Sequence, residues 1–480
     1  MILAVGSILA GSTVLALGSI RSGLPVLVAF LGLGMALGSD GPGGIDFTDA
    51  RLTRHAATVA LGLILFDGGL QTSWRRLREV AAPAAALSTI GVVVSALVTS
   101  LAAHLLFDVS WLEAVLLGAV VSSTDAAAVF STLRATAIRR RVARTLEAES
   151  GGNDPLAIAL TVGLIAWIEH PHTYGLGDLT LLVARQIGLG LALGLACAGV
   201  ASWLFARMPD EIAAFAPVAS VSTAAIAYGA TAVVGGSGFL AVYLVGLAVG
   251  STPSRYRRQL VNFHEGLAFV AQVGLFILLG LLVLPHELGR VALSGLALAL
   301  FLVLVARPVA VLASTFLSGF RRRERILLGW AGLRGAVPIV LAAFVLTSRV
   351  PDRQLIFNAV FFIVIVSVLL QGTTLERLAR RLDLVSAAPP SRHAPIEVGA
   401  LDQLDLVDFA VQHDHAINGA AVRELGLPRS SLVAVIERDG ASIPPRGSTI
   451  VRAGDRLHVL IPRRRRRDLA DVFNRWRRRV

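Results

Sequence analysis

Six consecutive residues, Glu149 to Asp154, place carboxylate, hydroxyl and amide side chains at the start of a long apolar run. On a helix, Ser150 and Asp154 are i,i+4 and share one face. Together they offer an oxygen-only pocket, and oxygen ligands suit hard cations such as Na⁺ and K⁺. Because burial disfavours the charged form of a carboxylate, Asp154 is suited to hold either a proton or a cation. This pattern indicates cation/proton exchange.

The composition is that of a polytopic membrane protein. The 480 residues are 55% hydrophobic and 16% charged, with a mean hydropathy of +0.71, whereas soluble domains carry about 25% charged residues. The formal net charge is +12, and all 44 basic residues are arginine. The one cysteine, Cys197, lies in an apolar run, which excludes a disulfide framework and a cysteine-based metal site.

The membrane spans follow from the length of the apolar runs. A crossing helix needs about 20 apolar residues, which gives about 13 spans here. They are residues 2–19, 23–38, 53–71, 82–107, 112–132, 148–168, 178–206, 212–233, 237–250, 264–284, 291–317, 326–347 and 354–373. If the N-terminus is outside, the inside loops hold roughly four times as many arginines as the outside loops, as the positive-inside rule requires. We expect a protein of the bacterial cytoplasmic (inner) membrane with its C-terminus in the cytoplasm.

The composition changes after Asp383, and four domains are predicted. They are a membrane domain at 1–383, a Pro- and Ser-rich linker at 384–394, a cytoplasmic α/β module at 395–465 and a basic tail at 466–480. In the module, LVDFAVQ, SLVAVIE and DRLHVLIP alternate as strands do, and INGAAVRELGL is typical of a short helix. The arginine-rich tail favours contact with anionic membrane lipid over nucleic acid.

Eight ionisable groups fall within the predicted spans. A charge at membrane depth costs at least about 2.5–3.5 kcal/mol on insertion scales, so each is a candidate for function. Three lie near span ends, where we expect them to snorkel: Arg185, Glu265 and Arg307. Five are candidates for the site: Asp67, Asp125, Glu149, Asp154 and Arg334.

Two spans carry patterns that interrupt a membrane helix. The fifth has four consecutive polar residues at its middle, Ser122 to Asp125, and the twelfth has a charge, Arg334, between glycines and a proline. Irregular backbone at membrane depth is tolerated where it is buried in protein or lines a cavity. Interrupted segments at corresponding positions of two halves point to a transporter binding site.

These breaks complete the predicted site. We expect carbonyl groups freed in the fifth span to join Asp154 and Ser150 as cation ligands. Glu149 points to a different face of its helix. Because a buried guanidinium must be paired, Glu149 is the expected partner of Arg334.

The chain resembles a known family, the monovalent cation:proton antiporters, and within it the bacterial potassium/proton branch with a C-terminal TrkA-C (RCK C-terminal) module. The stretches that carry the resemblance are GSILAG and the PVLVAFLGLGMALGSDGPGGI run (6–45), LFDGGL (65–70), STDAAAVF (123–130), ESGGNDPLA (149–157), GFLAVYLVGL (238–247) and LRGAVPIVLA (333–342). The resemblance implies an all-α membrane domain with inverted repeats and two broken crossing helices. It also implies a homodimer that works by an elevator-like shift.

The resemblance also assigns roles to the polar residues of the fifth and sixth spans. Asn153 and Asp154 are similar to the family's Asn-Asp pair, with Asp154 the shared cation and proton carboxylate. Thr124 and Asp125 resemble the pair in the unwound crossing helix, although Ala126 stands where many relatives have proline. Thr124 thereby joins Asp154 and Ser150 as an expected ligand of a monovalent cation.

Three further residues are assigned by the resemblance. Asp67 resembles an acid near the ion path, and Glu149 with Arg334 resembles the family's structural ion pair. Since electrogenic relatives carry a second Asp in place of the Asn, the single carboxylate implies one-for-one, electroneutral exchange.

The expected activity is exchange of K⁺, or of Na⁺, for H⁺ in cation and pH homeostasis. An Na⁺/H⁺ antiporter without K⁺ preference is one alternative, and a regulated cation channel is another. The channel is disfavoured because TVGL at 161–164 lacks the tyrosine of a potassium filter. The C-terminal module either binds a small-molecule regulator or only dimerises. No cofactor and no enzymatic reaction are expected, because the nucleotide fingerprint and a nucleophile–base motif were not found.

Overall fold

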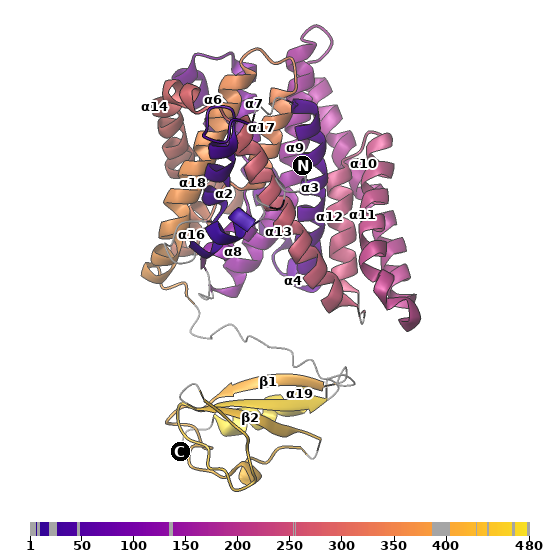
Figure 1. Cartoon of the computed structure of the whole chain (residues 1–480), viewed down its shortest axis with the longest axis vertical. Helices are drawn as coiled ribbons and strands as arrows, with labels where there is room; N and C mark the ends of the chain where they lie inside the picture. The colour runs from indigo at the N-terminus through magenta and orange to yellow at the C-terminus, as the bar shows by residue number, and fades with distance from the viewer. Residues whose placement is uncertain are drawn as a thin grey trace. The chain divides into compact units, whose positions relative to one another are not determined.

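The computed structural model describes residues 6, 10–18, 26–45, 49–133, 138–252, 254, 256–385, 404–428, 430–438, 441–462 and 466–477. The chain divides into two compact units, the membrane unit (Met1–Ser386) and the C-terminal module (Ala387–Val480). The membrane unit is helical, and the module is built on a small sheet (Figure 1). The predicted fold class is confirmed, whereas the number of spans stays a prediction because part of 2–19 lies outside the described residues.

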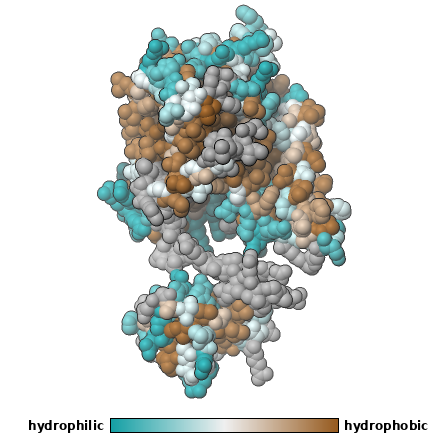
Figure 2. Space-filling view, viewed as in Figure 1, coloured by the Kyte–Doolittle hydropathy of each residue, from teal (hydrophilic) through white to brown (hydrophobic). Residues whose placement is uncertain are grey.

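In the described part of the chain, seven helical segments are long and apolar enough to cross a membrane. They are Ala81–Phe107, Arg140–Glu169, Leu176–Arg207, Glu211–Val233, Arg257–Leu282, Pro285–Thr315 and Arg353–Arg381. Four shorter apolar helices accompany them: Val26–Leu37, Trp111–Val120, Gly238–Ser251 and Ala336–Leu346. Figure 2 shows apolar side chains around the middle of the membrane unit and hydrophilic ones toward its two ends. This distribution suits a protein that lipid surrounds.

The order of elements recurs in the two halves of the membrane unit. The first half holds α2 (Val26–Leu37), α3 (Ala50–Gln71), α4 (Trp74–Arg78), α5 (Ala81–Ala86), η1 (Leu87–Gly91), α6 (Val92–Phe107), α7 (Trp111–Val120), α8 (Ala126–Leu133) and α9 (Arg140–Glu169). The second holds α10 (Leu176–Arg207), η2 (Asp210–Phe215), α11 (Ala216–Val233), α12 (Gly238–Ser251), α13 (Arg257–Leu282), α14 (Pro285–Phe301), η3 (Leu302–Ala306), α15 (Arg307–Thr315), α16 (Arg322–Trp330), α17 (Ala336–Leu346) and α18 (Arg353–Arg381).

Each half therefore contains a long helix with one π-helical turn, then a broken helix, then a second long helix. The π turns are η1 and η3. The broken helices are α7–α8 and α16–α17, and the long helices that follow them are α9 and α18. The two breaks correspond to the fifth and twelfth predicted spans.

Glycines allow α3 and α12 to pack at close range. A methyl group on Gly246 of α12 would overlap the carbonyl oxygen of Phe66 on α3, and one on Gly250 would overlap that of Leu70. Gly69 of α3 is equally close to the backbone of Tyr243. Small residues at such contacts let two membrane helices approach backbone to backbone. This contact fixes α12 beside the helix that carries Asp67.

In its described residues, the C-terminal module is a four-stranded antiparallel sheet with one α-helix and a short 3-10 helix. Its elements are β1 (Leu404–Ala410), η4 (Val422–Glu424), β2 (Leu432–Arg438), β3 (Ala441–Ile443), β4 (Arg456–Pro462) and α19 (Arg466–Trp476). The strand order is β1-β4-β2-β3. One face of the sheet carries the core, in which Phe409, Ile436, Leu457 and Val459 are buried.

The segment predicted to be a basic tail is in part a structural helix. α19 covers Arg466–Trp476, and its Val472 and Trp476 are buried in the core of the module. The Trp476 indole Nε1 donates to the carbonyl oxygen of Leu425 at 2.7 Å. The prediction of a lipid-facing tail that begins at 466 is therefore corrected for these residues, because their apolar side chains complete the core.

A buried ion pair joins two parts of the module. The Asp455 carboxylate is 1% exposed and accepts from Arg438 Nε at 2.7 Å, Arg438 Nη2 at 2.8 Å and the Arg452 backbone N–H at 2.7 Å. Burial raises the pKa of Asp455, but the hydrogen bonds and charges of Arg438 and Arg452 together outweigh it and hold the pKa below its ordinary value of 3.8.

Replacement of Gly246 tests the contact between α3 and α12. Gly246→Ala is expected to lower the free energy of unfolding by about 1–3 kcal/mol, because the added methyl forces the two backbones apart. Thermal unfolding of the detergent-purified chain measures this. The control is Gly62→Ala on α3, where a Cβ meets nothing within 4 Å. That change should leave the stability unchanged or raise it by about 0.5–1 kcal/mol. An equal loss of stability in Gly246→Ala and Gly62→Ala would contradict the prediction that α3 and α12 pack closely at Gly246.

Replacement of Asp455 tests the ion pair of the module. Asp455→Asn is expected to cost about 2 kcal/mol at pH 7, because Arg438 loses its charged partner. Since the folded pKa lies below the unfolded value, this stabilisation is complete above pH 3.8 and is lost as the pH falls through the folded pKa. Hydrogen exchange of β2 and β4 in the full chain measures the loss. Unchanged exchange at pH 7 would contradict the prediction.

Candidate functional site

The two broken helices meet at their breaks. Residues 121–125 separate α7 from α8, and residues 331–335 separate α16 from α17. The backbone N–H of Asp125 donates to the carbonyl oxygen of Leu333 at 2.9 Å, which ties one break to the other. Gly335 lies so close to the Asp125 carboxylate that any Cβ would overlap it. The sequence needs glycine there because a side chain on one break would displace the other.

The turn of α9 that holds Ser150, Asn153 and Asp154 faces the first break. Ser123 Oγ donates to Asp154 Oδ1 at 2.5 Å. Asn153 Nδ2 donates to Thr124 Oγ1 at 2.7 Å. Residues at i, i+3 and i+4 share a helix face, so one face of α9 presents all three side chains to the broken segment.

Two of the predicted ligands also hold the start of α8. Ser150 Oγ accepts from the backbone N–H of Ala126 at 3.2 Å, and Asp125 Oδ1 accepts from the N–H of Ala128 at 3.0 Å. The first N–H groups of a helix have no partner within it, and oxygen-bearing side chains commonly cap them. Asp125 is thus the N-terminal cap of α8, with its carboxylate committed to the backbone.

Glu149 pairs with Arg307, and the predicted pair with Arg334 is wrong. Arg307 Nη1 donates to Glu149 Oε1 at 2.5 Å and Nη2 donates to Oε2 at 3.0 Å, in a two-pronged contact. The two side chains are 3% and 1% exposed, so Arg307 does not snorkel as expected. It lies at the start of α15, directly after the π turn η3, which directs it into the unit. Arg185 and Glu265, which were given the same interpretation, are exposed.

Arg334 instead binds the carbonyl end of the first break. Its Nη1 donates to the carbonyl oxygens of Ser122 at 2.7 Å and Ser123 at 2.6 Å. Its backbone N–H donates to Ser367 Oγ at 3.1 Å. A cation at the C-terminus of a helix is favourable because that end carries partial negative charge. Two of the carbonyl groups expected to bind the transported cation are therefore already bound to Arg334.

Glycines bring α9 close to its neighbours. A Cβ on Gly151 would overlap the ring of Tyr243 on α12, and one on Gly152 would lie 2.6 Å from Ser88 Oγ in η1. Ser88 Oγ in turn donates to the carbonyl oxygen of Glu149 at 2.9 Å. The glycine pair between Ser150 and Asn153 thus lets the site helix sit directly against two others.

Asp67 lies apart from this cluster. It is half-buried on α3, and its Oδ2 accepts from Gln71 Nε2 at 2.7 Å. Between described residues, no hydrogen bond or ion pair joins Asp67 to Asp154. The buried Oδ1 of Asp67 has no hydrogen-bond partner there either. Its predicted place near the ion path stays a prediction.

The charge of Asp154 has no basic partner. Asp154 is 5% exposed, and neither arginine nor histidine forms an ion pair with it among the residues that the structure describes. The neighbouring Asn153 Oδ1 is buried without a hydrogen-bond partner in the same set. An ionised carboxylate out of water needs compensation, and a proton or a metal cation held by these oxygens would provide it.

Sequence reasoning missed three residues of the site. Ser123 was seen only as part of a polar block, yet it is the hydrogen-bond donor to Asp154. Arg307 was assigned to the membrane surface, and Ser88 carried no signal. The arginine could have been found from its position just before Pro308, where a helix register is commonly disturbed.

Comparison with known proteins places the chain in a family. Residues 6–381 match the family described as sodium/hydrogen exchanger, transmembrane, and residues 406–474 match the TrkA-C domain. A K(+)/H(+) antiporter NhaP2 of Shewanella baltica (strain OS223) is 38% identical over 98% of this chain and 82% of its own length. A K(+)/H(+) antiporter NhaP of Alkalimonas amylolytica is 38% identical over 96% of this chain and 80% of its own.

A more distant relative and a solved structure extend the comparison. The Na(+)/H(+) antiporter ApNhaP of Aphanothece halophytica is 28% identical over 75% of this chain and 70% of its own. The structure of the sodium proton antiporter MjNhaP1 from Methanocaldococcus jannaschii at pH 8 superposes with a TM-score of 0.70 over 79% of this chain and 99% of that one, at 22% identity. Two broken helices, a buried acid on the helix between them and these matches agree: the chain belongs to the sodium/hydrogen exchanger family and carries a TrkA-C domain.

Proposed function

We propose that this protein exchanges a monovalent cation, with K⁺ favoured over Na⁺, for H⁺ across the bacterial cytoplasmic membrane. The observation that carries the proposal is Asp154, a buried carboxylate without a basic partner beside the break of α7–α8. Such an acid binds a proton or a cation but not both, because either one neutralises it. Mutually exclusive occupancy is what an exchanger requires.

The surrounding oxygens supply the rest of a cation site. The side-chain oxygens of Ser150, Asn153 and Thr124 lie on or against the same face of α9 as the Asp154 carboxylate. Of these, Asn153 Oδ1 has no hydrogen-bond partner among the described residues. Oxygen donors of this kind suit a hard cation. The described residues hold no group of three or more histidine, cysteine or acidic side chains for a transition metal.

The choice of K⁺ rests on relatedness. Relatives at 38% identity are named K(+)/H(+) antiporters, whereas the Na(+)/H(+) antiporter ApNhaP is 28% identical. The neutral Asn153 beside Asp154 supports one cation for one proton. The alternatives are an Na⁺/H⁺ antiporter without K⁺ preference and a regulated cation channel, and the second would show single-channel currents in place of saturable, proton-coupled flux.

The oligomeric state, the transport movement and the membrane orientation are proposed by analogy with the family. We propose a homodimer whose site-bearing helices shift against the dimerising ones, with the N-terminus outside and the C-terminus in the cytoplasm. The arginine bias of the loops supports this orientation. We also propose that the TrkA-C domain binds a small regulatory ligand.

Removal of the Asp154 carboxylate tests the exchange site. Asp154→Asn is expected to abolish proton-coupled cation flux, because an amide neither releases a proton nor balances a cation. Dequenching of a pH dye in everted vesicles measures this, with K⁺, Na⁺, Li⁺ and Rb⁺ added separately. The control is Glu211→Gln, which removes an exposed acid on η2 and should retain flux. Exchange by the Asp154→Asn protein would reject the assignment, and equal responses to K⁺ and Na⁺ would remove the potassium preference.

Addition of a second carboxylate tests the stoichiometry. Asn153→Asp places another acid beside Asp154, so we expect its exchange to respond to an imposed membrane potential, whereas wild-type exchange should not. Exchange in K⁺-loaded proteoliposomes without valinomycin, followed with a voltage-sensitive dye, separates the two, because only an exchange that moves net charge responds to or generates a membrane potential. A wild-type flux that itself changes with potential would contradict the one-carboxylate argument.

A further inference from the structure

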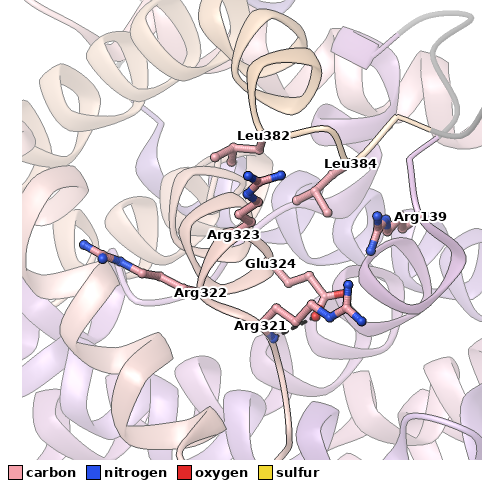
Figure 3. Close-up of a pocket in the computed structure, with 7 residues that line it drawn as sticks. All are labelled: Arg139, Arg321, Arg322, Arg323, Glu324, Leu382 and Leu384. Atoms are coloured by element: carbon pink, nitrogen blue, oxygen red, sulfur yellow. Dashed lines mark hydrogen bonds between the residues drawn. The ribbon is translucent and has the colours of Figure 1, made fainter.

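A cavity ringed by arginines lies at the end of the membrane unit from which the chain leaves for the module. Its volume is about 220 Å³. It is lined by Arg139, Arg321, Arg322, Arg323, Glu324, Leu382 and Leu384 (Figure 3). None of these residues belongs to the cluster around Asp154, so the cavity is a separate feature of the molecule.

Three elements of the exchanger meet at the cavity. Arg139 is the N-cap of α9, the helix that carries Asp154, and Arg321 is the N-cap of α16, the first half of the second broken helix. Leu384 follows the end of α18, and its carbonyl oxygen accepts from the Arg139 backbone N–H at 2.9 Å. An antiparallel bridge between Ile138 and Val385 continues this contact. The cavity therefore joins both helices of the site to the last residues before the linker.

The arginines of the cavity have no acidic partner among the described residues. Between described residues, the side chains of Arg139, Arg321, Arg322 and Arg323 form no ion pair. The one acid present, Glu324, is 6% exposed and accepts from the Arg321 backbone N–H at 2.9 Å as a helix cap. The lining thus carries four positive charges against one negative charge.

Two neighbouring arginines, Arg141 and Arg325, differ from these because their guanidinium groups bind backbone carbonyl oxygens. Arg325 Nη2 donates to the carbonyl oxygen of Thr315 at 2.9 Å. Arg141 Nη1 donates to that of Gly319 at 3.2 Å and lies over the ring of Phe320. These two guanidinium groups close the end of α15, whereas Arg321, Arg322 and Arg323 are exposed.

Two helix N-termini add to the positive charge. Such ends carry partial positive charge and free N–H groups, and they favour anions. Arginine offers donors only, so the Arg139 side chain cannot cap α9 as Asp or Ser would. Accordingly, α9 has no hydrogen bond from the side chain of its N-cap residue.

We propose that this cavity binds a phosphate-bearing anion. Guanidinium groups match phosphate oxygens in paired hydrogen bonds. The volume is below the roughly 300–1,000 Å³ of sites for drug-sized ligands, so it suits one phosphate group with a small substituent. The apolar side chains of Leu382 and Leu384 lie beside the arginines, as the carbon atoms of a phosphate ester require (Figure 3).

The anion would fasten the start of α9 and the start of α16 to the end of α18. In Figure 3, Arg139 and Arg321 lie around Glu324 and Leu384, whereas the guanidinium of Arg322 points away from them. Arg139 and Arg321 are therefore the residues expected to bind the phosphate, and Arg322 lines the cavity mainly with the aliphatic part of its side chain. The phosphate belongs either to the headgroup of an anionic lipid or to a small soluble compound.

Calorimetric titration of the detergent-purified full chain tests the proposal, whichever ion it exchanges. The probes are inorganic phosphate and short-chain phosphatidylglycerol, with short-chain phosphatidylcholine as the uncharged reference. At least one of the first two should bind once per chain. The double variant Arg139→Gln, Arg321→Gln should weaken binding by about tenfold or more, since the loss of one such contact is worth about tenfold. Arg322→Gln removes one positive charge at the start of α16, as Arg321→Gln does alone, and should change the affinity less than about threefold.

The outcomes separate the sources and can overturn the idea. Binding of phosphate itself assigns a soluble ligand, and binding of phosphatidylglycerol alone assigns a lipid headgroup. Failure of both probes to bind overturns the proposal, as does an equal loss in Arg322→Gln, which indicates diffuse surface charge. If the double variant unfolds, the single variant Arg321→Gln and the comparison of Arg139→Lys with the single variant Arg139→Gln decide. Arg321→Gln should weaken binding, and Arg139→Lys should retain more of it than Arg139→Gln does.

Discussion

The need to satisfy backbone groups away from water governs this structure. A helix that breaks at membrane depth leaves N–H and C=O groups without partners, each of which costs several kcal/mol in hydrocarbon. Here the breaks satisfy one another: Arg334 binds the carbonyl end of α7, and Asp125 caps the amino end of α8 while its own N–H binds Leu333. Once these groups are paired, the acid left without a partner charge beside the break is Asp154.

The two buried arginines, Arg307 and Arg334, bind different kinds of partner. Arg307 neutralises Glu149 in a closed pair, and removal of one partner of such a pair typically costs 3–5 kcal/mol. Arg334 has no carboxylate within ion-pair distance among the described residues and is balanced by carbonyl dipoles instead. Because both arginines are bound elsewhere, neither competes with an incoming cation for Asp154. The site is thereby kept for ions from outside the protein.

The sequence predicted the local features of the site better than its long-range partners. The polar block at 122–125, the glycines around Arg334 and the i,i+4 spacing of Ser150 and Asp154 are all short-range patterns, and they located both breaks. The partner of Glu149 is 158 residues away on α15, and Pro308 beside it indicates a disturbed helix but not which acid the arginine binds. The helix α19 was missed for another reason, since Val472 and Trp476 do recur at helical spacing but stand among arginines that indicated a solvated tail.

Each of the two repeated halves contains one π turn. Each turn interrupts the long helix that precedes a broken one, and both bear on Glu149. Ser88 of η1 binds its carbonyl oxygen, and η3 ends immediately before Arg307, which binds its carboxylate. A π turn adds one residue to a helical turn and so rotates all that follows, and such turns are frequent at functional sites. Without the extra residue of η3, Arg307 would face a different direction. The position of the site helix thus depends on two irregular turns, one from each half.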